Sequence, residues 1–364
     1  MDLSLGIVGL PNVGKSTLFN ALTRKGIPAA NYPFCTIDPN IGVVAVPDKR
    51  IDEISEFVNP ENKIYPIIEF VDIAGLVKGA HNGEGLGNQF LGNIRNVNAI
   101  IHLIRDFKDE KITHVENKVD PKSDKEVVEA ELILKDLETI DKIYPKMHEE
   151  SRRDKKNQKY TDLLNGIKEA LNKGQLARNF TNEDDLEVIK YRKTLCLLTD
   201  KPLIYLINTE IGNCKDENID QFKGKIGLPK DANVVLMDVK IEAELSDLEP
   251  LDREIFMKEY GIKESALDRL IKDSYTLLNL ITFLTAGPKE VRGWTIRKGF
   301  TAPEAAGEIH TDFMEKFITA EVVDYDDFIK FKGWNNAKEN GKVRLEGKTY
   351  IVKDGDVMII RHGA

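Results

Sequence analysis

A run of eight residues near the start of the chain has the residue types and the spacing of a phosphate-binding loop. Residues 9–16 read GLPNVGKS and match the pattern G-x-x-x-x-G-K-S/T, between an apolar strand pattern and a helical pattern. Glycines let backbone N–H groups wrap around a phosphate chain, and the start of a helix adds partial positive charge there. We expect Lys15 to contact the β- and γ-phosphates and the Ser16 hydroxyl to bind Mg²⁺. Because the flanking strand and helix are the context that this motif requires, it is the strongest functional signal in the sequence.

Two further segments carry residues suited to sensing the third phosphate. Asp72 ends the apolar run 67–71 and opens the sequence DIAG, where a carboxylate holds Mg²⁺ through water and Gly75 can approach the γ-phosphate. Thr36 lies in the loop between the first predicted helix and the next strand. A switch threonine at this place would sense Mg²⁺ and the γ-phosphate, and a solvated loop threonine is the alternative interpretation.

The residue after Gly75 is Leu76, where Ras-like GTPases place the glutamine that orients the attacking water. Leucine cannot hydrogen-bond water, so we expect slow intrinsic hydrolysis unless another group positions it. His114, in the loop after the fourth strand, is a candidate, although a lone loop histidine is more often a surface residue. Asn12 in the phosphate loop offers a carbonyl that could ligate a monovalent cation such as K⁺, which would replace the missing side chain.

The segment expected to read the base lacks the guanine-specific pattern N-K-x-D. After the apolar run 203–207 the chain reads NTEI, so Asn208 is followed by Thr209, Glu210 and Ile211. Ile211 cannot accept the two guanine hydrogen bonds, and each donor left unpaired in a dry pocket costs about 1–3 kcal/mol. Asn208 offers both a donor and an acceptor to adenine. We therefore expect selectivity to move toward ATP or to be lost.

Length and composition fit a soluble globular protein of two or three domains, with 364 residues, 41% hydrophobic and 31% charged. The formal net charge of −9 disfavours a nucleic-acid binder held by overall positive charge. Three widely spaced cysteines argue against a disulfide scaffold and fit a reducing cytosol. No apolar run approaches the roughly 18 residues of a membrane helix, and no signal peptide is evident. We predict a cytoplasmic protein without a membrane partner.

Short apolar runs alternate with helical patterns over the first 120 residues and again after residue 200, which predicts a mostly parallel sheet covered by helices. The expected strands cover residues 5–9, 41–46, 64–71, 99–104, 203–207 and 234–237, and the expected helices cover residues 16–23 and 87–96. Apolar stripes over 130–144 and 160–171 predict an antiparallel helical hairpin, with Pro145 kinking or ending its first helix. An ordinary amphipathic pair packed on the sheet is the alternative.

From about residue 281 the sequence pattern changes to short strand-like runs separated by residues typical of turns. Expected strands are 291–297, 317–323, 350–352 and 357–360, and residues 302–310 are an expected helix. These patterns predict a small α+β module.

Several long runs resemble the Obg-related GTPases and, within them, the YchF subfamily, the Obg-like ATPases. The runs that carry the resemblance are 9–22, 31–37, 72–80 and 83–91, and toward the end of the chain 287–292, 294–297, 305–313 and 350–356, which resemble the TGS module of that subfamily. The resemblance covers essentially the whole chain. It implies a P-loop NTPase domain of the G type at 1–122 and 200–280, an inserted helical hairpin at 123–199, and a β-grasp TGS domain at 281–364.

The resemblance also implies a function. It implies ATP hydrolysis in preference to GTP, with Leu76 in place of the catalytic glutamine, association with ribosomes, and a role in translation or stress response. The subfamily carries a histidine in the loop where His114 stands. Two positions depart from its pattern: Glu210 comes one position earlier than in the usual N-x-x-E, and Asp238 stands where a serine is expected.

The site residues that follow from these observations fall into three groups. We predict as catalytic Lys15, Thr36 and His114; as nucleotide-binding Asn12, Val13, Gly14, Lys15, Ser16, Thr17, Gly75, Asn208 and Glu210; and as metal ligands Ser16, Thr36 and Asp72. The expected cofactor is Mg²⁺, with K⁺ as a further candidate, and the expected chain is monomeric.

Two basic segments are candidates for contact with ribosomal RNA. Five positive charges lie at the hairpin tip, at Arg152, Arg153, Lys155, Lys156 and Lys159, and further basic residues flank Trp294. A solvated tip and a core tryptophan are the alternatives.

The overall prediction is a slow ATPase that acts as a nucleotide-dependent switch and binds ribosomes. The alternatives are a GTPase translation factor and an RNA- or ribosome-binding module with incidental turnover.

Overall fold

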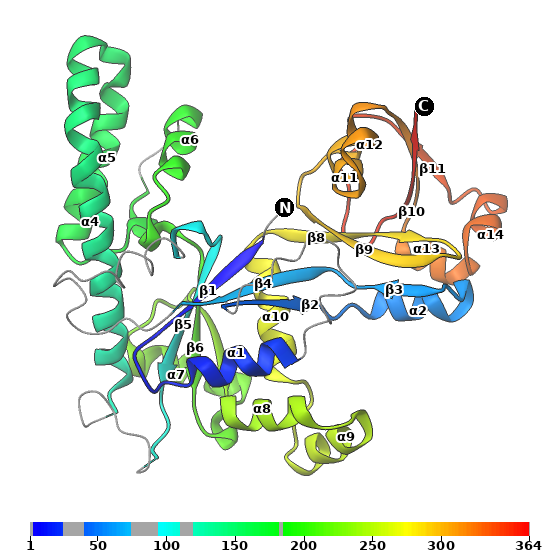
Figure 1. Cartoon of the computed structure of the whole chain (residues 1–364), viewed down its shortest axis with the longest axis horizontal. Helices are drawn as coiled ribbons and strands as arrows, with labels where there is room; N and C mark the ends of the chain where they lie inside the picture. Colours follow the sequence, from blue (N-terminus) through cyan, green and yellow to red (C-terminus); the bar gives the residue numbers. More distant parts are fainter. Residues whose placement is uncertain (1–2, 25–39, 74–93, 110–118, 182–184, 364) are drawn as a thin grey trace.

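The computed structural model describes residues 3–24, 40–73, 94–109, 119–181 and 185–363 (Figure 1). Its centre is a six-stranded sheet in the order β2-β4-β1-β5-β6-β7. The strands are β1 (Ser4–Val8), β2 (Ile41–Ala45), β4 (Ile67–Asp72), β5 (Ala99–Arg105), β6 (Leu203–Asn208) and β7 (Asn233–Met237). All neighbours are parallel except β2 and β4, which confirms the mostly parallel sheet.

Near-continuous apolar runs explain why β5 and β6 occupy interior positions of this sheet. Every residue of both strands is buried, as is usual for parallel strands covered by helices. The helices that contact this sheet's strands are α1 (Lys15–Arg24), α4 (Pro121–Arg153), α7 (Ile219–Ile226) and α10 (Ala266–Leu277). Helix α8 (Val239–Asp247) packs against α1 and is followed by α9 (Pro250–Glu259).

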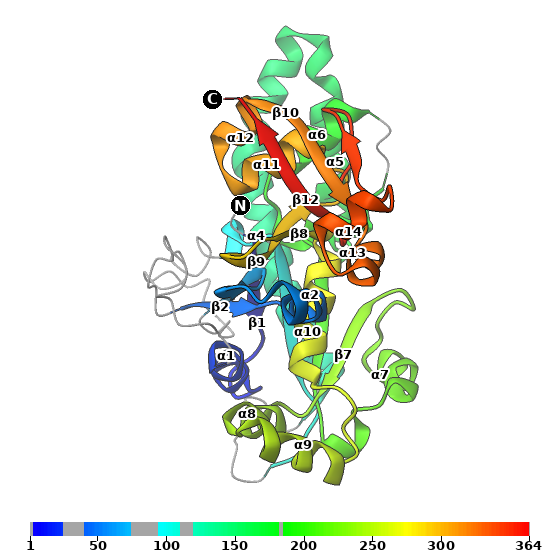
Figure 2. The same cartoon turned by 90° about the vertical axis from the view of Figure 1, so that its right-hand side faces the viewer.

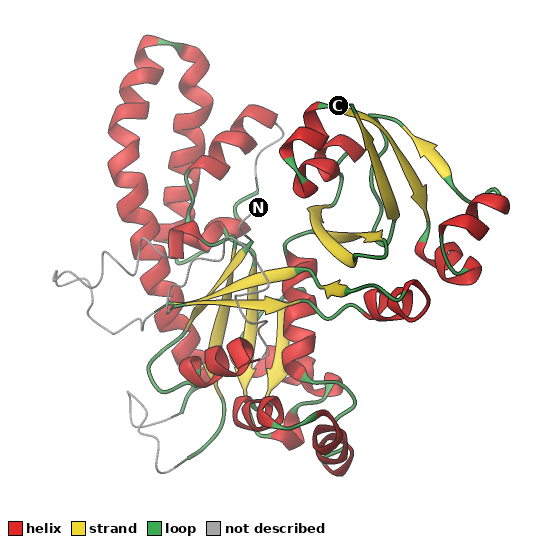
Figure 3. Ribbon diagram, turned by 45° about the vertical axis from the view of Figure 1, so that its right-hand side comes forward, coloured by secondary structure: helices red, strands yellow, loops and turns green. Residues whose placement is uncertain are grey.

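An antiparallel pair of helices, α4 and α5 (Gln158–Asn172), projects from the sheet as the predicted hairpin (Figures 1 and 3). The base of α4 contributes Val128 and Leu132 to the core of the central sheet, whereas Ile140 packs with Leu164 and Ile167 in a separate cluster. Of the two effects expected of Pro145, a kink or an end of the first helix, the end is wrong, because α4 continues to Arg153, and the kink stays a prediction. Pro145 lies on the exposed side, where the carbonyl that it leaves unpaired can bond to water. Helix α6 (Leu186–Thr194) packs against α5.

A second six-stranded sheet has the order β11-β10-β12-β8-β9-β3. Its strands are β3 (Asn62–Ile64), β8 (Leu280–Ala286), β9 (Glu290–Arg297), β10 (Phe317–Val323), β11 (Arg344–Glu346) and β12 (Val357–His362). Its helices are α11 (Ala302–Ile309), α12 (Thr311–Glu315), α13 (Tyr325–Phe331) and α14 (Trp334–Glu339). We call residues 280–363 the C-terminal unit. The expected strand 350–352 is wrong, because only Ile351 forms a single bridge, with Thr301.

A segment from the first part of the chain completes the C-terminal unit (Figure 2). The expected strand 64–71 is two strands: β4 stays in the central sheet, and β3 pairs in parallel with β9. Pro66 lies between them and packs on Gly293, where a Cβ would sit 2.8 Å from the proline ring. Because proline has no N–H for a sheet ladder, the chain changes sheets there.

Helix α2 (Lys49–Val58) precedes β3 and packs on the same second sheet. Its apolar face buries Ile51 and Ile54 completely, in one cluster with Leu284 and Phe328. The predicted division assigned residues 49–64 to the first domain, whereas their helix and strand pack with the C-terminal unit.

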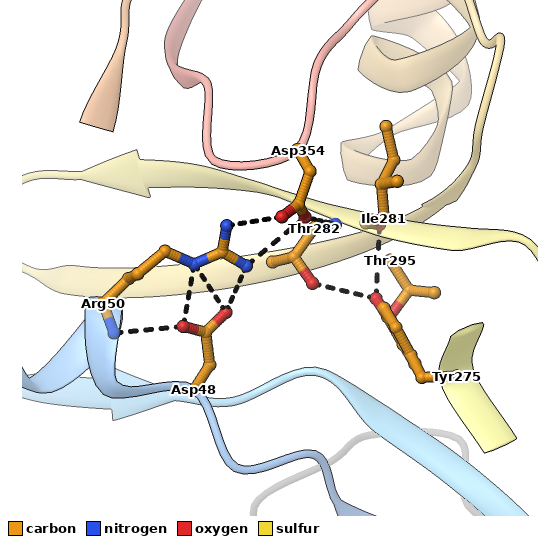
Figure 4. A network of polar contacts seen from close by, with 7 residues as sticks. All are labelled: Asp48, Arg50, Tyr275, Ile281, Thr282, Thr295 and Asp354. Carbon is orange, nitrogen blue, oxygen red and sulfur yellow. Dashed lines mark hydrogen bonds and ion pairs between the residues drawn. The ribbon is translucent and has the colours of Figure 1, made fainter. Parts of the chain in front are cut away.

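Polar contacts tie the two sheets together at the start of α2 (Figure 4). Arg50 donates to Asp48 at 2.7 Å and to Asp354 at 2.8 Å, and Asp354 also accepts the Thr282 backbone N–H at 2.8 Å. From α10, the Tyr275 hydroxyl reaches the side chains of Thr282 at 2.9 Å and Thr295 at 3.0 Å. None of the helices in the described ranges has the length and apolar character needed to cross a membrane.

Candidate functional site

The phosphate loop joins β1 to α1 in a tight bend. Asn12 and Gly14 have φ of 62° and 105°, and a Cβ at Gly9 would lie 2.5 Å from the Leu103 carbonyl oxygen. Glycine is needed at position 9 because the backbone of Leu103 approaches closely, and at position 14 because the backbone there is left-handed. The Lys15 ammonium donates to the Gly9 and Leu10 carbonyls, each at 2.8 Å, so it lies folded over the loop.

Asp72 reaches this loop because β4 runs parallel to β1, with Asp72 opposite Ile7. Burial lowers the pKa of Lys15, and the Asp72 charge opposes that shift. Burial likewise raises the pKa of Asp72, against the effect of Lys15. Within the described part of the chain, Asp72 Oδ1 is buried and has no hydrogen-bond partner. Mg²⁺ prefers oxygen ligands, and the Asp72 carboxylate and the Ser16 hydroxyl both supply oxygen atoms. The residues present therefore fit this ion.

The phosphate loop opens into a cleft of about 580 Å³. It is lined by Asn12, Gly14, Lys15, Ser16, Thr17, Phe107, Lys108, Asp109, Asn208, Thr209, Glu210, Asp238, Val239 and Lys240. The fold thus brings together seven of the predicted nucleotide-binding residues, namely Asn12, Gly14, Lys15, Ser16, Thr17, Asn208 and Glu210. Val13 is buried and does not line the cleft, and its part in nucleotide binding stays a prediction. Thr36, Gly75, Leu76 and His114 lie outside the described residues.

Asn208, at the end of β6, has its side-chain amide engaged by backbone. Its Nδ2 donates to the Val13 carbonyl at 3.0 Å, and its Oδ1 accepts the Val239 N–H at 3.1 Å. A Cβ at Gly14 would lie 2.7 Å from the same Nδ2. Asn208 therefore connects the phosphate loop to the start of α8 through two hydrogen bonds. Its predicted direct contact with adenine stays a prediction.

The two loops at the far end of the cleft are joined by Asp238. Its Oδ1 accepts the Ile241 N–H at 3.1 Å as the N-cap of α8, and its Oδ2 accepts the Ile211 N–H at 3.1 Å. A serine has only one side-chain oxygen for these two bonds, which gives the departure at this position a structural reason. Glu210 is exposed at the rim of the cleft.

The wall formed by residues 107–109 was missed by the sequence reasoning. Phe107 is half-buried and presents an aromatic ring to the cleft. A signal for it existed, since residues just after the carboxyl end of a central parallel strand lie at the ligand edge of such sheets. The apolar run 99–104 pointed to that edge.

Comparisons with known proteins agree along the whole chain. Residues 4–135 match the family described as 50S ribosome-binding GTPase, and residues 280–363 match the YchF-GTPase_C family, described as a protein of unknown function. The chain is 49% identical over 367 residues to the ribosome-binding ATPase YchF of Bacillus subtilis, with 99% of each covered. It is 48% identical to the protein of that name from Escherichia coli O157:H7, with 98% of each covered.

A solved structure, that of the Schizosaccharomyces pombe YchF GTPase, superposes with a TM-score of 0.87 at 36% identity, covering 99% of this chain and 98% of that one. Identity and coverage of this extent, over both sheets and the hairpin between them, are shared by members of one family. The chain belongs to the YchF family.

Proposed function

We propose that this chain is a Mg²⁺-dependent ATPase of low intrinsic rate that works as a nucleotide-gated switch on ribosomes. The observation that carries the proposal is the cleft that Lys15 and Ser16 of the phosphate loop line, together with the Asp72 carboxylate, whose charge acts on Lys15. Relatives of this chain are named ribosome-binding ATPases. The monomeric state and the cytoplasmic location that we expect for this chain fit a role on ribosomes.

The phosphate end of the cleft supplies charge and orientation. Lys15 exchanges its two carbonyl partners for the β- and γ-phosphates, which is favourable because an ammonium binds phosphate more strongly than a neutral oxygen. Ser16 and Asp72 would hold Mg²⁺, which neutralises phosphate charge when bound. Thr36 and Gly75 are proposed to contact the γ-phosphate side. We propose His114 as the polar group that positions water in the absence of a glutamine at position 76, and the side-chain carbonyl of Asn12 as a ligand for K⁺.

The base end of the cleft favours adenine. Ile211 offers no carboxylate to the guanine N1–H and 2-amino groups, and its backbone N–H already bonds to Asp238. Phe107 supplies an aromatic face on which a purine can stack. Glu210 at the rim is the remaining carboxylate of the predicted base segment.

Titration with fluorescent ATP and GTP analogues tests the base preference. We expect ATP to bind about tenfold more tightly or better, because two unpaired guanine donors cost about 1–3 kcal/mol each. GTP binding tenfold more tightly than ATP would support the GTPase translation factor instead. Turnover is measured in parallel in K⁺ and Na⁺ buffers, and equal rates would remove K⁺ from the proposal.

The basic hairpin tip is the proposed contact with ribosomal RNA. Arg152, Lys155 and Lys156 are exposed, and within the described residues none of them forms an ion pair. Arg153 pairs with Glu149, and Lys159 pairs with Asp185 at 2.8 Å, so they contribute less free charge. Trp294 is half-buried, and its Nε1 donates to Thr285 at 2.9 Å beneath the Arg292 guanidinium. The tip is therefore the stronger of the two predicted RNA surfaces.

Co-sedimentation with ribosomes tests this contact and the switch together. We expect the variant with Arg152, Lys155 and Lys156 all changed to Ala to lose most ribosome binding at about 0.15 M salt, because phosphate contacts dominate such affinity. The control variant Arg153→Ala, which removes an already paired charge, should bind nearly as well as wild type. Binding that is the same with ATP, ADP and no nucleotide would favour an RNA-binding module with incidental turnover.

A further inference from the structure

The largest fully buried side chain in the described residues is a charged one, that of Arg105. It ends the central strand β5 beside the cleft, and only 1% of its surface is exposed. Burying a guanidinium costs free energy that hydrogen bonds must offset. The partners that the fold supplies to this charge therefore indicate what it does.

Three nitrogens of the Arg105 guanidinium group donate to backbone carbonyls in the two loops that wall the cleft. Nη1 donates to Asn12 in the phosphate loop at 3.4 Å. Nε donates to Phe107 at 3.2 Å and Nη2 to Asp109 at 3.4 Å, both in the loop after β5. One planar group thus spans the phosphate loop and the aromatic wall, and it bonds to a residue, Asn12, that holds a left-handed φ of 62°.

The same guanidinium stacks on the Phe107 ring, with its carbon 4.4 Å from the ring centroid. Such stacking fixes a ring that otherwise rotates. The residue before it, Asp106, donates its backbone N–H to the Asn208 carbonyl at 2.8 Å, so the wall is also tied to β6. Phe107 is therefore held through its ring and through the residue before it, and it lines the cleft.

We propose that Arg105 is a positioning residue that holds Phe107 as a stacking platform for the nucleotide base at a fixed distance from the phosphate loop. The inference rests on the proposed function, because it assigns the base to this cleft. Arg105 itself does not touch the nucleotide. Lysine cannot replace it, since an ammonium lacks the planar fork that reaches both loops and stacks on the ring.

The test compares two ligands, a fluorescent ATP analogue and inorganic tripolyphosphate, which has no base. In Arg105→Lys we expect ATP affinity to fall about tenfold and tripolyphosphate affinity to change less than about threefold, because the platform serves the base. Phe107→Leu should reproduce the ATP loss. The double variant should then bind ATP about as well as Phe107→Leu alone, because the two residues act as one unit.

A control is Arg178→Lys, at a half-buried arginine that also donates to a backbone carbonyl, that of Thr199 at 2.9 Å, away from the cleft. It should leave the affinity for both ligands unchanged. Unchanged ATP affinity in Arg105→Lys would overturn the proposal, as would equal losses for both ligands or additive losses in the double variant.

Folding defects are also decisive. If Arg105→Lys does not fold, Arg105→Gln, which keeps N–H donors without the charge, takes its place. Failure of both variants while Arg178→Lys folds would make Arg105 a structural residue and overturn the proposal. A wild-type chain that does not bind ATP would overturn the proposed function as well, which separates the two failures.

Discussion

Replacing Lys15 with alanine should abolish ATP hydrolysis and weaken ATP binding by about 100-fold, because it removes a side-chain ammonium that bonds to the phosphate loop's own carbonyls. Burial lowers the pKa of Lys15, and the nearby Asp72 carboxylate favours its charged form. The ammonium is therefore poised to transfer from carbonyls to phosphates. Isothermal titration with ATP and a phosphate-release assay measure the two losses.

A second lysine in this chain provides a closely matched control. Lys201 also donates to two backbone carbonyls, those of Arg95 at 2.9 Å and Val97 at 2.5 Å, and burial lowers its pKa too. It lies just before the amino end of β6, whereas the cleft lies at the carboxyl end of that strand. Lys201→Ala should lower thermal stability and leave ATP affinity intact. Wild-type turnover in Lys15→Ala would contradict the assignment of the whole site.

The phosphate loop could be predicted from sequence because its chemistry is local. Glycine spacing, a lysine and a hydroxyl lie within one run, and the strand and helix around them follow from short apolar patterns. The expected strands at 99–104 and 203–207 match β5 and β6 closely, since fully buried parallel strands read as continuous apolar runs.

Features that depend on distant partners could not be predicted in this way. An asparagine at position 208 suits a purine as well as it suits two backbone groups, and only the fold brings Val13 and Val239 to it. Arg105 likewise looks like an ordinary charged residue after an apolar strand. Its burial depends on the closeness of Asn12, which lies far away in sequence.

The placement of residues 49–64 is the largest example of such a non-local feature. Ile51 and Ile54 are three residues apart, a spacing that places both on one face of a helix. The spacing does not indicate which of the two sheets this face packs against. The strand β3 has only three residues, too few for a clear signal. The segment then returns through Pro66 into β4, which ends at Asp72. One continuous stretch therefore links the metal-ligand candidate to the core of the C-terminal unit.

This placement predicts that residues 280–363, expressed alone, will not fold cooperatively. The fragment would lack Ile51 and Ile54, both fully buried, and each loss of such a side chain costs about 2–5 kcal/mol. It would also lose the β3–β9 ladder and the Arg50–Asp354 ion pair. These losses together match the roughly 5–15 kcal/mol that stabilise a whole domain. Circular dichroism melting and tryptophan emission of the fragment measure the result.

A peptide covering residues 47–65 should restore a cooperative melting transition to that fragment, because it returns the helix face and the edge strand together. In the full chain, Ile54→Ala should destabilise by about 2–5 kcal/mol and Ile54→Val by about 0.5–1.5 kcal/mol, a graded pair that separates lost packing from nonspecific damage. ATP affinity should be unchanged in both variants at temperatures below the transition. A fragment that melts as sharply alone as it does with the peptide would show that α2 and β3 rest on the C-terminal unit without stabilising it.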